Sequence, residues 1–373
     1  MAQLVAIDLP GGQAFVNALR SVWLRGDAVL PIDQRLPAPA RQRLIDALQP
    51  TRIVDASGEH TVDGREVLDG DALVMPTSGS TGTPKGVVHT MAALEASAHA
   101  GNQRLGITAD DHWLACLPLA HIGGFTVITK AFVAGTGLTV LPGFDAAEVT
   151  RLARSDVTAV SLVPTALARI DPALFRVILL GGSRPPAQRP VNCIATYGLT
   201  ETGSGIAYDG IALDGVELRI AADGEVLVRG PMLMRAYRDG STTIDTEGWL
   251  HTDDIGTIDA QGRLQVQGRR GDMIVTGGEN VWPDAVEAVL ARSAAVAEVA
   301  VAGVDDPEWG QRVVAWVVPR DATNPPRLAD LRALVAEELA AFMAPKELVL
   351  VDALPRTALG KVQRHALAPP SAR

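Results

Sequence analysis

The stretch VTAVSLVPTALARIDPALFRVILLGG, residues 157–182, decides the fold class of this chain. Two apolar runs, 157–163 and 175–180, flank a short segment of helical character that begins at Pro164. A third run, CIATYG, follows at 193–198. Strands that alternate with helices are typical of a mostly parallel sheet with helices on both faces. The stretch therefore predicts an α/β fold.

The same alternation extends toward the N-terminus, where we predict strands at 28–33, 52–55, 72–76, 112–118 and 138–142. The expected helices lie between residue 11 and the strand at 28, and at 37–50, 90–105, 122–134 and 146–155. From about residue 206 the pattern changes to short β segments with tight turns at 222–225 (ADGE) and 259–263 (DAQGR). These segments predict a small β subdomain.

After Arg269 the pattern changes again, to strands at 272–278, 296–304 and 312–319 with helices from Pro283 and over 328–342. We place the domain boundary in GRRGD, 268–272. The prediction is a large N-terminal domain, 1–269, and a small mobile α+β C-terminal domain, 270–373.

Composition limits the classes of partner. The 373 residues are 47% hydrophobic and 20% charged, with a net charge of −10 and no cluster of Lys and Arg. These values argue against a nucleic acid or an anionic membrane as partner. The two cysteines, Cys116 and Cys193, lie in apolar surroundings and predict buried free thiols. No run approaches the roughly 18 apolar residues of a membrane helix, and charged residues interrupt the first thirty positions, so we expect a cytoplasmic protein.

The loop PTSGSTGTPKGVVHT, 76–90, concentrates glycines, hydroxyls and one lysine. It resembles the Walker pattern GxxxxGK[ST], but Pro84 and Gly86 stand where a glycine and a hydroxyl belong. Free backbone N–H groups, hydroxyls and a lysine ammonium still suit phosphate oxygens. The alternative is a surface turn. The candidate phosphate ligands are Thr77, Ser78, Gly79, Ser80, Thr81, Gly82 and Lys85.

Three further segments carry candidate groups. In TYGLTETGSG, 196–205, Glu201 beside Thr200 would suit a magnesium ion that faces a triphosphate. In GWLHTDDIG, 248–256, an aspartate could accept from two ribose hydroxyls. In PRTALGKVQRHAL, 355–367, Lys361 follows a glycine turn. Taken singly, each has an ordinary structural alternative: a solvated carboxylate, a loop aspartate and a surface charge.

Taken together, five segments resemble those of the acyl-adenylate-forming superfamily of acyl-CoA synthetases, luciferases and adenylation domains. They are TSGSTGTPKG, YGLTE, HTDD, GRRGDMIVTGGENVWPDAVE and PRTALGK, in that family's order over 70–373. The resemblance implies that a carboxylate attacks the α-phosphate of Mg²⁺-ATP to give acyl-AMP and pyrophosphate. A thiol, most often that of coenzyme A, then takes the acyl group.

The resemblance also implies roles for individual residues. Lys361 would bridge the substrate carboxylate and the phosphate, where a preplaced cation offsets the repulsion of two anions. The small domain would rotate between the half-reactions about Arg270 and Gly271. The remaining implied sets are the adenine site (Gly181, Gly182, Ser183, Thr196, Tyr197, Gly198), the phosphate and Mg²⁺ groups (Thr200, Glu201), the ribose pair (Asp254, Arg269) and the pantetheine tunnel (Gly277, Gly278). Two positions depart from the family: Asp253 stands where glycine is usual, and Gly271 where relatives often carry Asp or Lys.

The acid is indicated by segments outside these motifs. LPLAHIGGFTVITKAFVAG, 117–135, and SLVPTALARI, 161–170, resemble o-succinylbenzoate–CoA ligases of menaquinone synthesis, which are also short at the N-terminus. His121 would then be a catalytic residue at the mouth of the acyl pocket, near where carboxylate and thiol meet. Lys130 or Arg169 could pair with a second substrate carboxylate, although a solvated helix face is the favoured interpretation of each.

Three alternatives remain at this point. A free-standing adenylation domain could serve a carrier protein, but the aspartate that such domains place after the pocket phenylalanine is replaced here by Thr126. The adenylate could pass to an amine or another nitrogen nucleophile. A non-catalytic protein could have kept the fold. The expected partners are a small carboxylic acid, ATP and coenzyme A, with a homodimer left open.

Overall fold

The computed structural model describes residues 2–78, 84–182, 185–186, 188–356 and 362–367. The chain divides into two compact units. The first comprises Met1–Arg219, Leu227–Thr252 and Ala260–Leu264, and the second comprises Ile220–Val226, Asp253–Asp259 and Gln265–Arg373. The predicted boundary at 268–272 falls inside the second unit by this division, and the hinge there stays a prediction.

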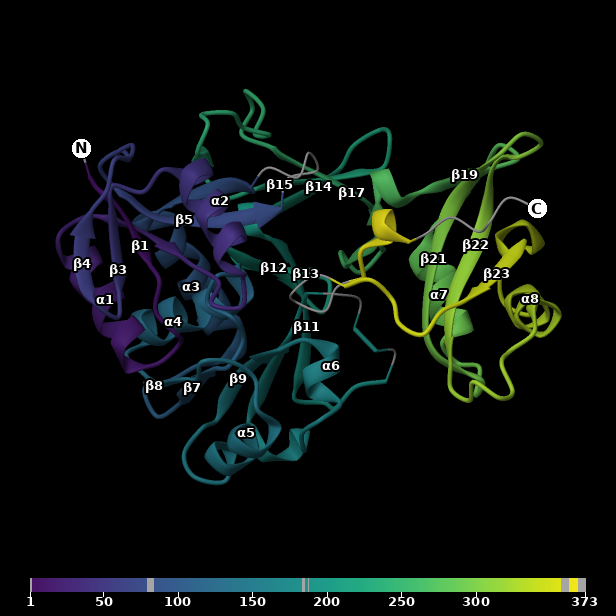
Figure 1. Cartoon of the computed structure of the whole chain (residues 1–373), viewed down its shortest axis with the longest axis horizontal. Helices are drawn as coiled ribbons and strands as arrows, with labels where there is room; N and C mark the ends of the chain where they lie inside the picture. Colours follow the sequence, from purple (N-terminus) through teal and green to yellow (C-terminus); the bar gives the residue numbers. More distant parts are fainter. Residues whose placement is uncertain (1, 79–83, 183–184, 187, 357–361, 368–373) are drawn as a thin grey trace. The chain divides into compact units, whose positions relative to one another are not determined.

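The first unit contains two seven-stranded sheets (Figure 1). The first sheet has the order β16-β6-β5-β2-β1-β3-β4. Its strands are β1 (Leu4–Ile7), β2 (Ala28–Pro31), β3 (Arg52–Asp55), β4 (Gly58–Thr61), β5 (Asp71–Ser78), β6 (Pro84–Thr90) and β16 (Ala236–Tyr237). The pairs β1–β2, β1–β3 and β2–β5 are parallel, whereas β3–β4, β5–β6 and β6–β16 are antiparallel. This sheet is therefore mixed, with three parallel and three antiparallel pairs.

The second sheet has the order β13-β12-β11-β10-β9-β7-β8. Its strands are β7 (His112–Ala115), β8 (Gly137–Val140), β9 (Ala159–Leu162), β10 (Val177–Leu180), β11 (Cys193–Leu199), β12 (Ser204–Tyr208) and β13 (Ile211–Ala212). The five strands from β8 to β11 are parallel, and only β12 and β13 run antiparallel at one edge. Here the prediction from residues 157–198 is confirmed.

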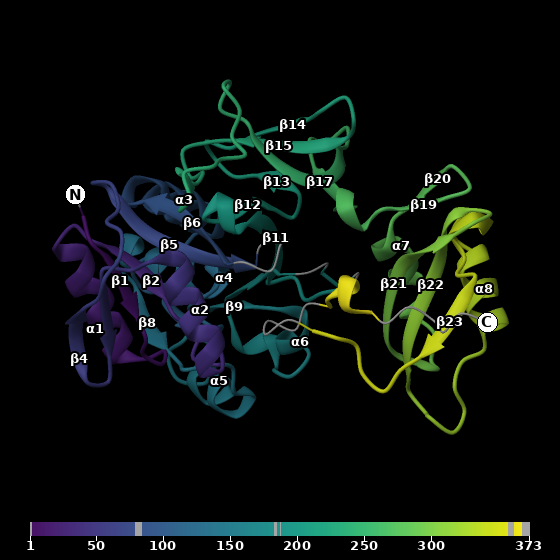
Figure 2. The same ribbon diagram turned by 45° about the horizontal axis from the view of Figure 1, so that its top comes forward.

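Helices cover both sheets at the predicted positions. They are α1 (Gln13–Leu24), α2 (Ala38–Leu48), α3 (Met91–Leu105), α4 (Ile122–Ala134), α5 (Ala146–Ala153), α6 (Pro164–Leu167) and the 3₁₀ turns η1 (Pro172–Leu174) and η2 (Thr200–Thr202). Helix α1 packs on β1 and β2 (Figure 2). Helix α3 begins where the Thr90 hydroxyl accepts from Ala93 N, as expected of an N-cap. Helices α3 and α4 contact each other and β12, and the α4 side chains are buried around most of the helix.

A third sheet of order β14-β15-β17-β18 corresponds to the predicted small β subdomain. Its strands are β14 (Glu217–Ile220), β15 (Glu225–Arg229), β17 (Leu250–Ile258) and β18 (Leu264–Arg269). The predicted turns fall between β14 and β15 and between β17 and β18. Gly224 and Gly262 have φ of 86° and 75° there, a left-handed conformation that glycine adopts without a steric cost.

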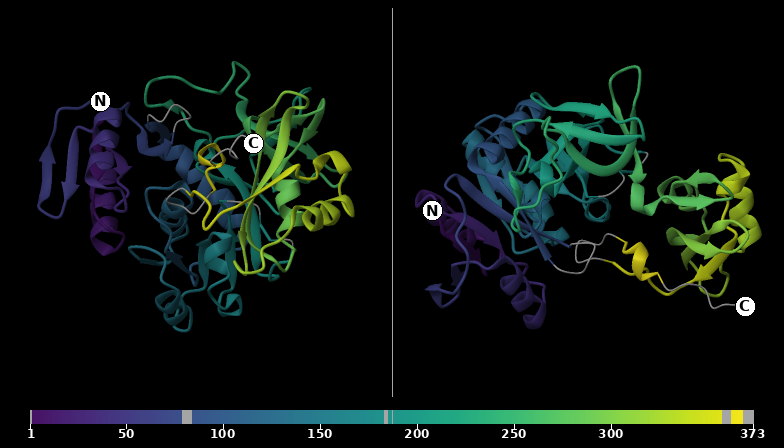
Figure 3. Two further views of the ribbon diagram at one scale, coloured as in Figure 1. Left: turned by 45° about the vertical axis from the view of Figure 1, so that its right-hand side comes forward. Right: turned by 90° about the horizontal axis from the view of Figure 1, so that it is seen from above.

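The C-terminal part of the second unit is a five-stranded sheet with helices on one face (Figure 3). Its elements are η3 (Arg270–Asp272), β19 (Ile274–Thr276), β20 (Glu279–Val281), α7 (Pro283–Leu290), β21 (Val296–Asp306), β22 (Gly310–Pro319), α8 (Leu328–Ala336), η4 (Ala341–Met343), β23 (Glu347–Leu350) and η5 (Arg364–Ala366). Val286 of α7 and Val335 of α8 share one buried cluster with Val301 and Val313 of the sheet. Trp316 on the opposite face packs with Leu354 and the C-terminal segment. The predicted α+β unit is confirmed.

None of the helices in the described part of the chain is both long and apolar enough to cross a bilayer.

Candidate active site

One group of predicted site residues lies where the strands of the second sheet end. Strands β7, β9, β10 and β11 are mutually parallel, so their carboxyl ends share one edge. His121 follows β7, Gly181 and Gly182 follow β10, and Tyr197 lies near the end of β11. The carboxyl edge of parallel strands is where α/β proteins bind ligands. The structure therefore brings these predicted residues to one side of the sheet.

Close packing explains the glycines at this edge. A Cβ on Gly181 would lie 2.9 Å from the Thr196 hydroxyl oxygen, and a Cβ on Gly198 would lie 2.2 Å from the Ser204 carbonyl oxygen. The strand irregularity between Tyr197 and Gly198 occurs at the same place. These glycines let β10, β11 and β12 approach more closely than other residues allow. Ser183, predicted for the same site, lies outside the described residues.

The predicted phosphate loop joins the antiparallel strands β5 and β6. Thr77 pairs with Lys85 and Ser78 with Pro84, and the Thr77 hydroxyl donates to the Lys85 carbonyl at 3.4 Å. The predictions for Gly79, Ser80, Thr81 and Gly82 fall outside the described residues. Strand β6 itself was not predicted.

Gly86, which departs from the Walker pattern, has a packing role. A Cβ there would lie 2.6 Å from Val74 Cγ1 and 2.9 Å from Leu48 Cδ2. A serine or threonine at this position would therefore collide with α2 and β5. The glycine lets α2 lie close against the hairpin.

Glu201 has two neighbours that link it to this hairpin. The Tyr237 hydroxyl donates to Glu201 Oε1 at 2.9 Å, and the Lys85 ammonium lies 5.2 Å from the centre of the Tyr237 ring. Tyr237 belongs to β16, which pairs with β6. The carboxylate and the lysine predicted to serve the phosphates thus converge on one tyrosine. The sequence analysis missed Tyr237, which lies 36 residues from Glu201.

A buried histidine ties the same strand to the Glu201 turn. His89 of β6 is fully buried, and its Nε2 lies 2.7 Å from the Thr200 carbonyl oxygen. Because a carbonyl only accepts, Nε2 carries the proton. Burial lowers the pKa of His89 to about 4, against the opposing effect of the Thr200 hydrogen bond, so the ring is neutral at pH 7. The described residues offer its Nδ1 no hydrogen-bond partner.

The Glu201 carboxylate fits a magnesium ion that is bound mainly through substrate phosphates. Mg²⁺ usually takes one or two carboxylates and completes its shell with phosphate oxygens and water. Glu201 supplies such a carboxylate, already oriented by Tyr237. Within the described ranges, no three His, Cys, Asp or Glu side chains form a protein-only cation cage.

The predicted ribose residues lie in the second unit. Asp254 in β17 is 7% exposed, and its Oδ1 lies 3.0 Å from Nε of Arg269 at the end of β18. Asp253 has φ of 60°, a left-handed conformation that strains a residue with a Cβ. This backbone explains why glycine is usual there. Arg270, the predicted hinge residue, pairs with Asp223 at 3.0 Å.

The two glycines predicted for the pantetheine tunnel form the turn between β19 and β20. Gly277 and Gly278 have φ of 60° and 83°, as a two-residue hairpin turn of the primed type requires. A Cβ on Gly277 would lie 2.9 Å from the Trp309 ring, whereas one on Gly278 would meet nothing within 4 Å. The turn accounts for both glycines structurally, and their role toward coenzyme A stays a prediction. Lys361 lies outside the described residues.

His121 contacts two residues of the first sheet's carboxyl edge. Its Nε2 lies 3.1 Å from Nη2 of Arg35 and 3.6 Å from Oδ2 of Asp33. Both partners follow β2, and neither was predicted as a site residue, although Asp33 ends the strand predicted at 28–33.

Lys130 is buried, which corrects the expectation of a solvated helix face. The side chain is 1% exposed, and its Nζ donates to the Ser204 hydroxyl at 2.9 Å. Burial lowers its pKa from 10.5 to about 8. The signal was present in the sequence, because the helix IGGFTVITKAFVA is apolar all round, as buried helices are. Arg169, in contrast, is exposed and its guanidinium lies 5.1 Å from the Phe144 ring centre.

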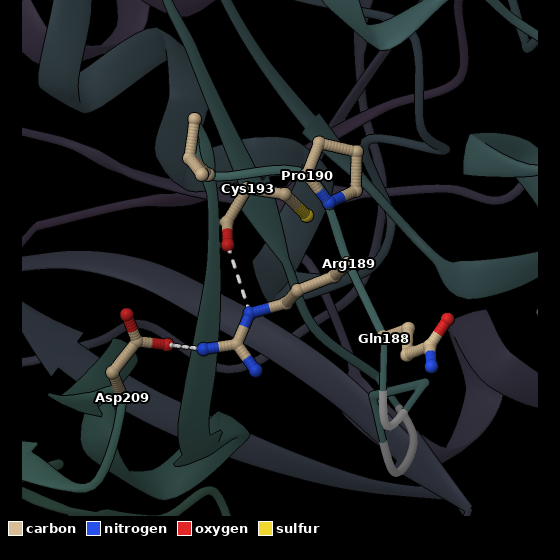
Figure 4. A pocket seen from close by; sticks show the side chains of 6 residues that line it. Gln188, Arg189, Pro190, Cys193 and Asp209 are labelled. Carbon is tan, nitrogen blue, oxygen red and sulfur yellow. Dashed lines mark hydrogen bonds and ion pairs between the residues drawn. The ribbon is translucent and has the colours of Figure 1, made fainter.

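Both cysteines are buried free thiols, as predicted. Cys193 borders an open cavity of about 430 Å³ at the amino end of β11, the opposite end from Glu201 (Figure 4). Arg189 in this cavity donates to the Cys193 carbonyl at 2.9 Å and forms an ion pair with Asp209. Its guanidinium is therefore already engaged by groups of the protein. This cavity is not part of the candidate site.

Two segments of the chain match known protein families. Residues 59–238 match the family described as AMP-binding enzyme, and residues 285–361 match the AMP-binding enzyme C-terminal domain. A probable 2-succinylbenzoate–CoA ligase of Mycobacterium tuberculosis is 39% identical over 361 residues, which cover 88% of this chain and 93% of the relative.

Solved structures agree with this match. The o-succinylbenzoate CoA synthetase of Bacillus subtilis in complex with its acyl-adenylate intermediate superposes with a TM-score of 0.88 at 29% identity, covering 99% of this chain and 88% of that one. The same enzyme with ATP and a magnesium ion gives 0.86 at 30% identity, covering 98% and 89%.

Proposed function

Since the chain belongs to the family of AMP-binding enzymes, we propose that it is an ATP-dependent ligase that joins 2-succinylbenzoate to coenzyme A. The observation that carries this proposal is the 39% identity to a probable 2-succinylbenzoate–CoA ligase over 93% of that relative. The carboxyl-edge site, with Lys85, Tyr237 and Glu201 in contact, supports a nucleotide-dependent reaction at the same place.

The reaction has two steps. A carboxylate oxygen of the acid bonds to the α-phosphorus of ATP, and the bond to the β-phosphate oxygen breaks, which releases pyrophosphate. The coenzyme A sulfur then bonds to the acyl carbon, the thiol loses its proton, and AMP leaves. Both steps crowd negative charge, so preplaced donors and cations lower the barrier.

The residues divide this work as follows. Thr77 and Lys85 at the base of the hairpin hold the terminal phosphates, and Tyr197 lies against adenine beside Gly181 and Gly182. Glu201, oriented by Tyr237, holds the magnesium ion, whose chemistry is to neutralise phosphate charge. Asp254 accepts from the ribose hydroxyls, and Arg269 fixes that carboxylate. Lys361 bridges the acid and the α-phosphate during adenylation.

Lys130 is the cation that we assign to the second carboxylate of 2-succinylbenzoate. A buried ammonium is costly unless an anion joins it, and the hydrogen bond that Lys130 makes among the described residues goes to a neutral group, the Ser204 hydroxyl. Ser204 lies just beyond the η2 turn that carries Glu201. Arg169 is the weaker candidate, because its guanidinium already lies over Phe144 at the surface.

Residues 270–373, within the second unit, form the moving part. Arg270 and Gly271 form the hinge, where Gly271 has nothing within 4 Å of an added Cβ and can change its backbone angles freely. Rotation removes Lys361 after adenylation and brings Gly277 and Gly278 to the pantetheine arm. The enzyme works in the cytoplasm on small molecules, without nucleic acid or membrane, and a homodimer is compatible with this assignment.

The test measures acid-dependent pyrophosphate release over a panel of aryl, succinyl-aryl and fatty acids, with and without coenzyme A. In the presence of coenzyme A, we expect a thioester to form with 2-succinylbenzoate and with no other acid of the panel. Accumulation of acyl-AMP with no thioester would instead favour a carrier protein or an amine as acceptor. Lys361→Ala should abolish adenylation yet leave transfer from supplied acyl-AMP largely intact. Lys346→Ala, at a lysine over the Trp309 ring, is the matched control.

A further inference from the structure

The imidazole of His121 lies between a group that only donates and a group that only accepts. The Arg35 guanidinium has N–H donors and no acceptor, and the Asp33 carboxylate, when ionised, has acceptors and no donor. Both face the same ring atom, Nε2, at 3.1 and 3.6 Å. The state of that atom therefore decides which partner it bonds.

Asp33 and Arg35 are themselves fixed. Arg35 Nε and Nη2 reach the two Asp33 oxygens at 2.8 and 2.7 Å, and the Arg35 backbone N–H adds a third bond at 3.0 Å. The Asp33 side chain is 8% exposed. Burial raises its pKa, but the hydrogen bonds from the Arg35 side chain and backbone, with the charge of the guanidinium, outweigh this and hold the pKa well below its usual range. Asp33 is thus a permanent anion in a rigid fork.

The topology places this pair at the carboxyl end of the first sheet. Strand β2 is parallel to β5, so Asp33 and Arg35, which follow β2, lie at the same edge of the sheet as Thr77 near the end of β5. His121 reaches the pair from the N-terminus of α4.

We propose that Asp33 and Arg35 are positioning residues that set the tautomer and orientation of His121 at the mouth of the acyl pocket. This inference rests on the proposed ligase function. In the neutral ring, Nε2 accepts from Arg35 and the proton resides on Nδ1. In the protonated ring, Nε2–H donates to Asp33. Either way Nε2 stays anchored to the first sheet, and the Nδ1 side faces its surroundings as an N–H donor.

The test reads the tautomer directly. We would record long-range ¹H–¹⁵N spectra of ¹⁵N-histidine-labelled protein and assign His121 by its loss in His121→Gln. Neutral His121 should be the Nδ1–H tautomer in the wild type. Arg35→Met should convert it to Nε2–H, because Asp33 is then the only partner of the pair. Glu148→Gln, in an exposed Glu–Arg pair of α5, is the control and should change nothing.

Kinetics give the second readout. Asp33→Asn and Arg35→Met should lower kcat about tenfold or more, while KM for ATP changes less than twofold, because a displaced catalytic group costs rate rather than nucleotide binding. Arg35→Lys keeps the positive charge but not the two-pronged guanidinium, so its kcat should lie between those of the other two variants and the wild type. It replaces Asp33→Asn in the test if that variant does not fold. An Nε2–H tautomer in the wild type, or unchanged tautomer and kcat in Arg35→Met, would overturn the proposal. A wild type without ligase activity but with the expected tautomers would refute the proposed function instead.

Discussion

Replacing Lys130 with methionine should stabilise the protein while damaging its choice of substrate. The ammonium is buried between α4 and β12, and the only charge compensation we assign to it comes from the substrate. Methionine keeps the unbranched shape of the lysine stem and removes the charge. The substitution thus separates what the lysine costs the fold from what it does for the reaction.

The size of the stabilisation follows from the depressed pKa. A fall in pKa from 10.5 to about 8 corresponds to about 3 kcal/mol of cost for keeping the buried group charged. Loss of the hydrogen bond to Ser204 returns about 1 kcal/mol. We therefore expect Lys130→Met to gain about 2 kcal/mol at pH 7, within the range found when buried charges are replaced by apolar groups.

The pH dependence has a definite sign. Between pH 8 and 10.5 the unfolded chain binds a proton at Lys130 that the folded chain has released, so the stability of the wild type rises with pH through this window relative to the variant. Urea midpoints of both proteins at pH 7 and pH 10 measure the difference, with Lys346→Met as control. A variant that is less stable at pH 7, or a gap that does not narrow by pH 10, would refute the reasoning. In contrast to its higher stability, Lys130→Met should be the poorer enzyme. Its KM for 2-succinylbenzoate should be raised, and its preference for 2-succinylbenzoate over benzoate should be lost.

Three further predictions follow from local geometry. Tyr237→Phe removes the donor to Glu201, so pyrophosphate release should need several-fold more Mg²⁺, as a magnesium titration would show; an unchanged Mg²⁺ requirement would contradict the assigned orientation. Asp253→Gly relieves a left-handed backbone and should raise the free energy of unfolding by about 1 kcal/mol in urea, whereas a loss of stability would show that its contacts matter more. Gly86→Ala should destabilise by about 1–3 kcal/mol because its Cβ would lie 2.6 Å from a valine methyl, whereas Gly123→Ala, with open space around it, should not; equal melting temperatures would refute the packing argument.

Much of the first unit was predictable because its signals are local. The strands in 157–198 are short apolar runs bounded by turn residues, and the loop glycines at their ends have backbone or packing reasons that recur in any such sheet. Strand β6 was missed because PKGVVHT begins with residues that disfavour strands. It forms because it pairs with β5, where Val88 of β6 lies opposite Val74 and both side chains are buried. Tertiary pairing overrides local propensity there.

The site was predictable only where a motif carried it. Tyr237, His89, Asp33 and Arg35 act through partners 36, 111, 88 and 86 residues away, and no spacing rule joins residues across two sheets. Lys130 was misjudged for a different reason. A lysine is expected at the surface, but the apolar residues on every side of α4 force it inward.

The hydrogen bond from His89 has a mechanical consequence. It links β6 of the first sheet to the η2 turn that carries Glu201 in the second sheet. Tyr237 of β16, next to β6, makes a second hydrogen bond to the same turn. Strands β5 and β6 and the Glu201 carboxylate therefore belong to a single stiff frame. If ATP binds there, as we propose, substitutions in other loops of the second sheet should alter the choice of acid and leave the requirement for ATP unchanged.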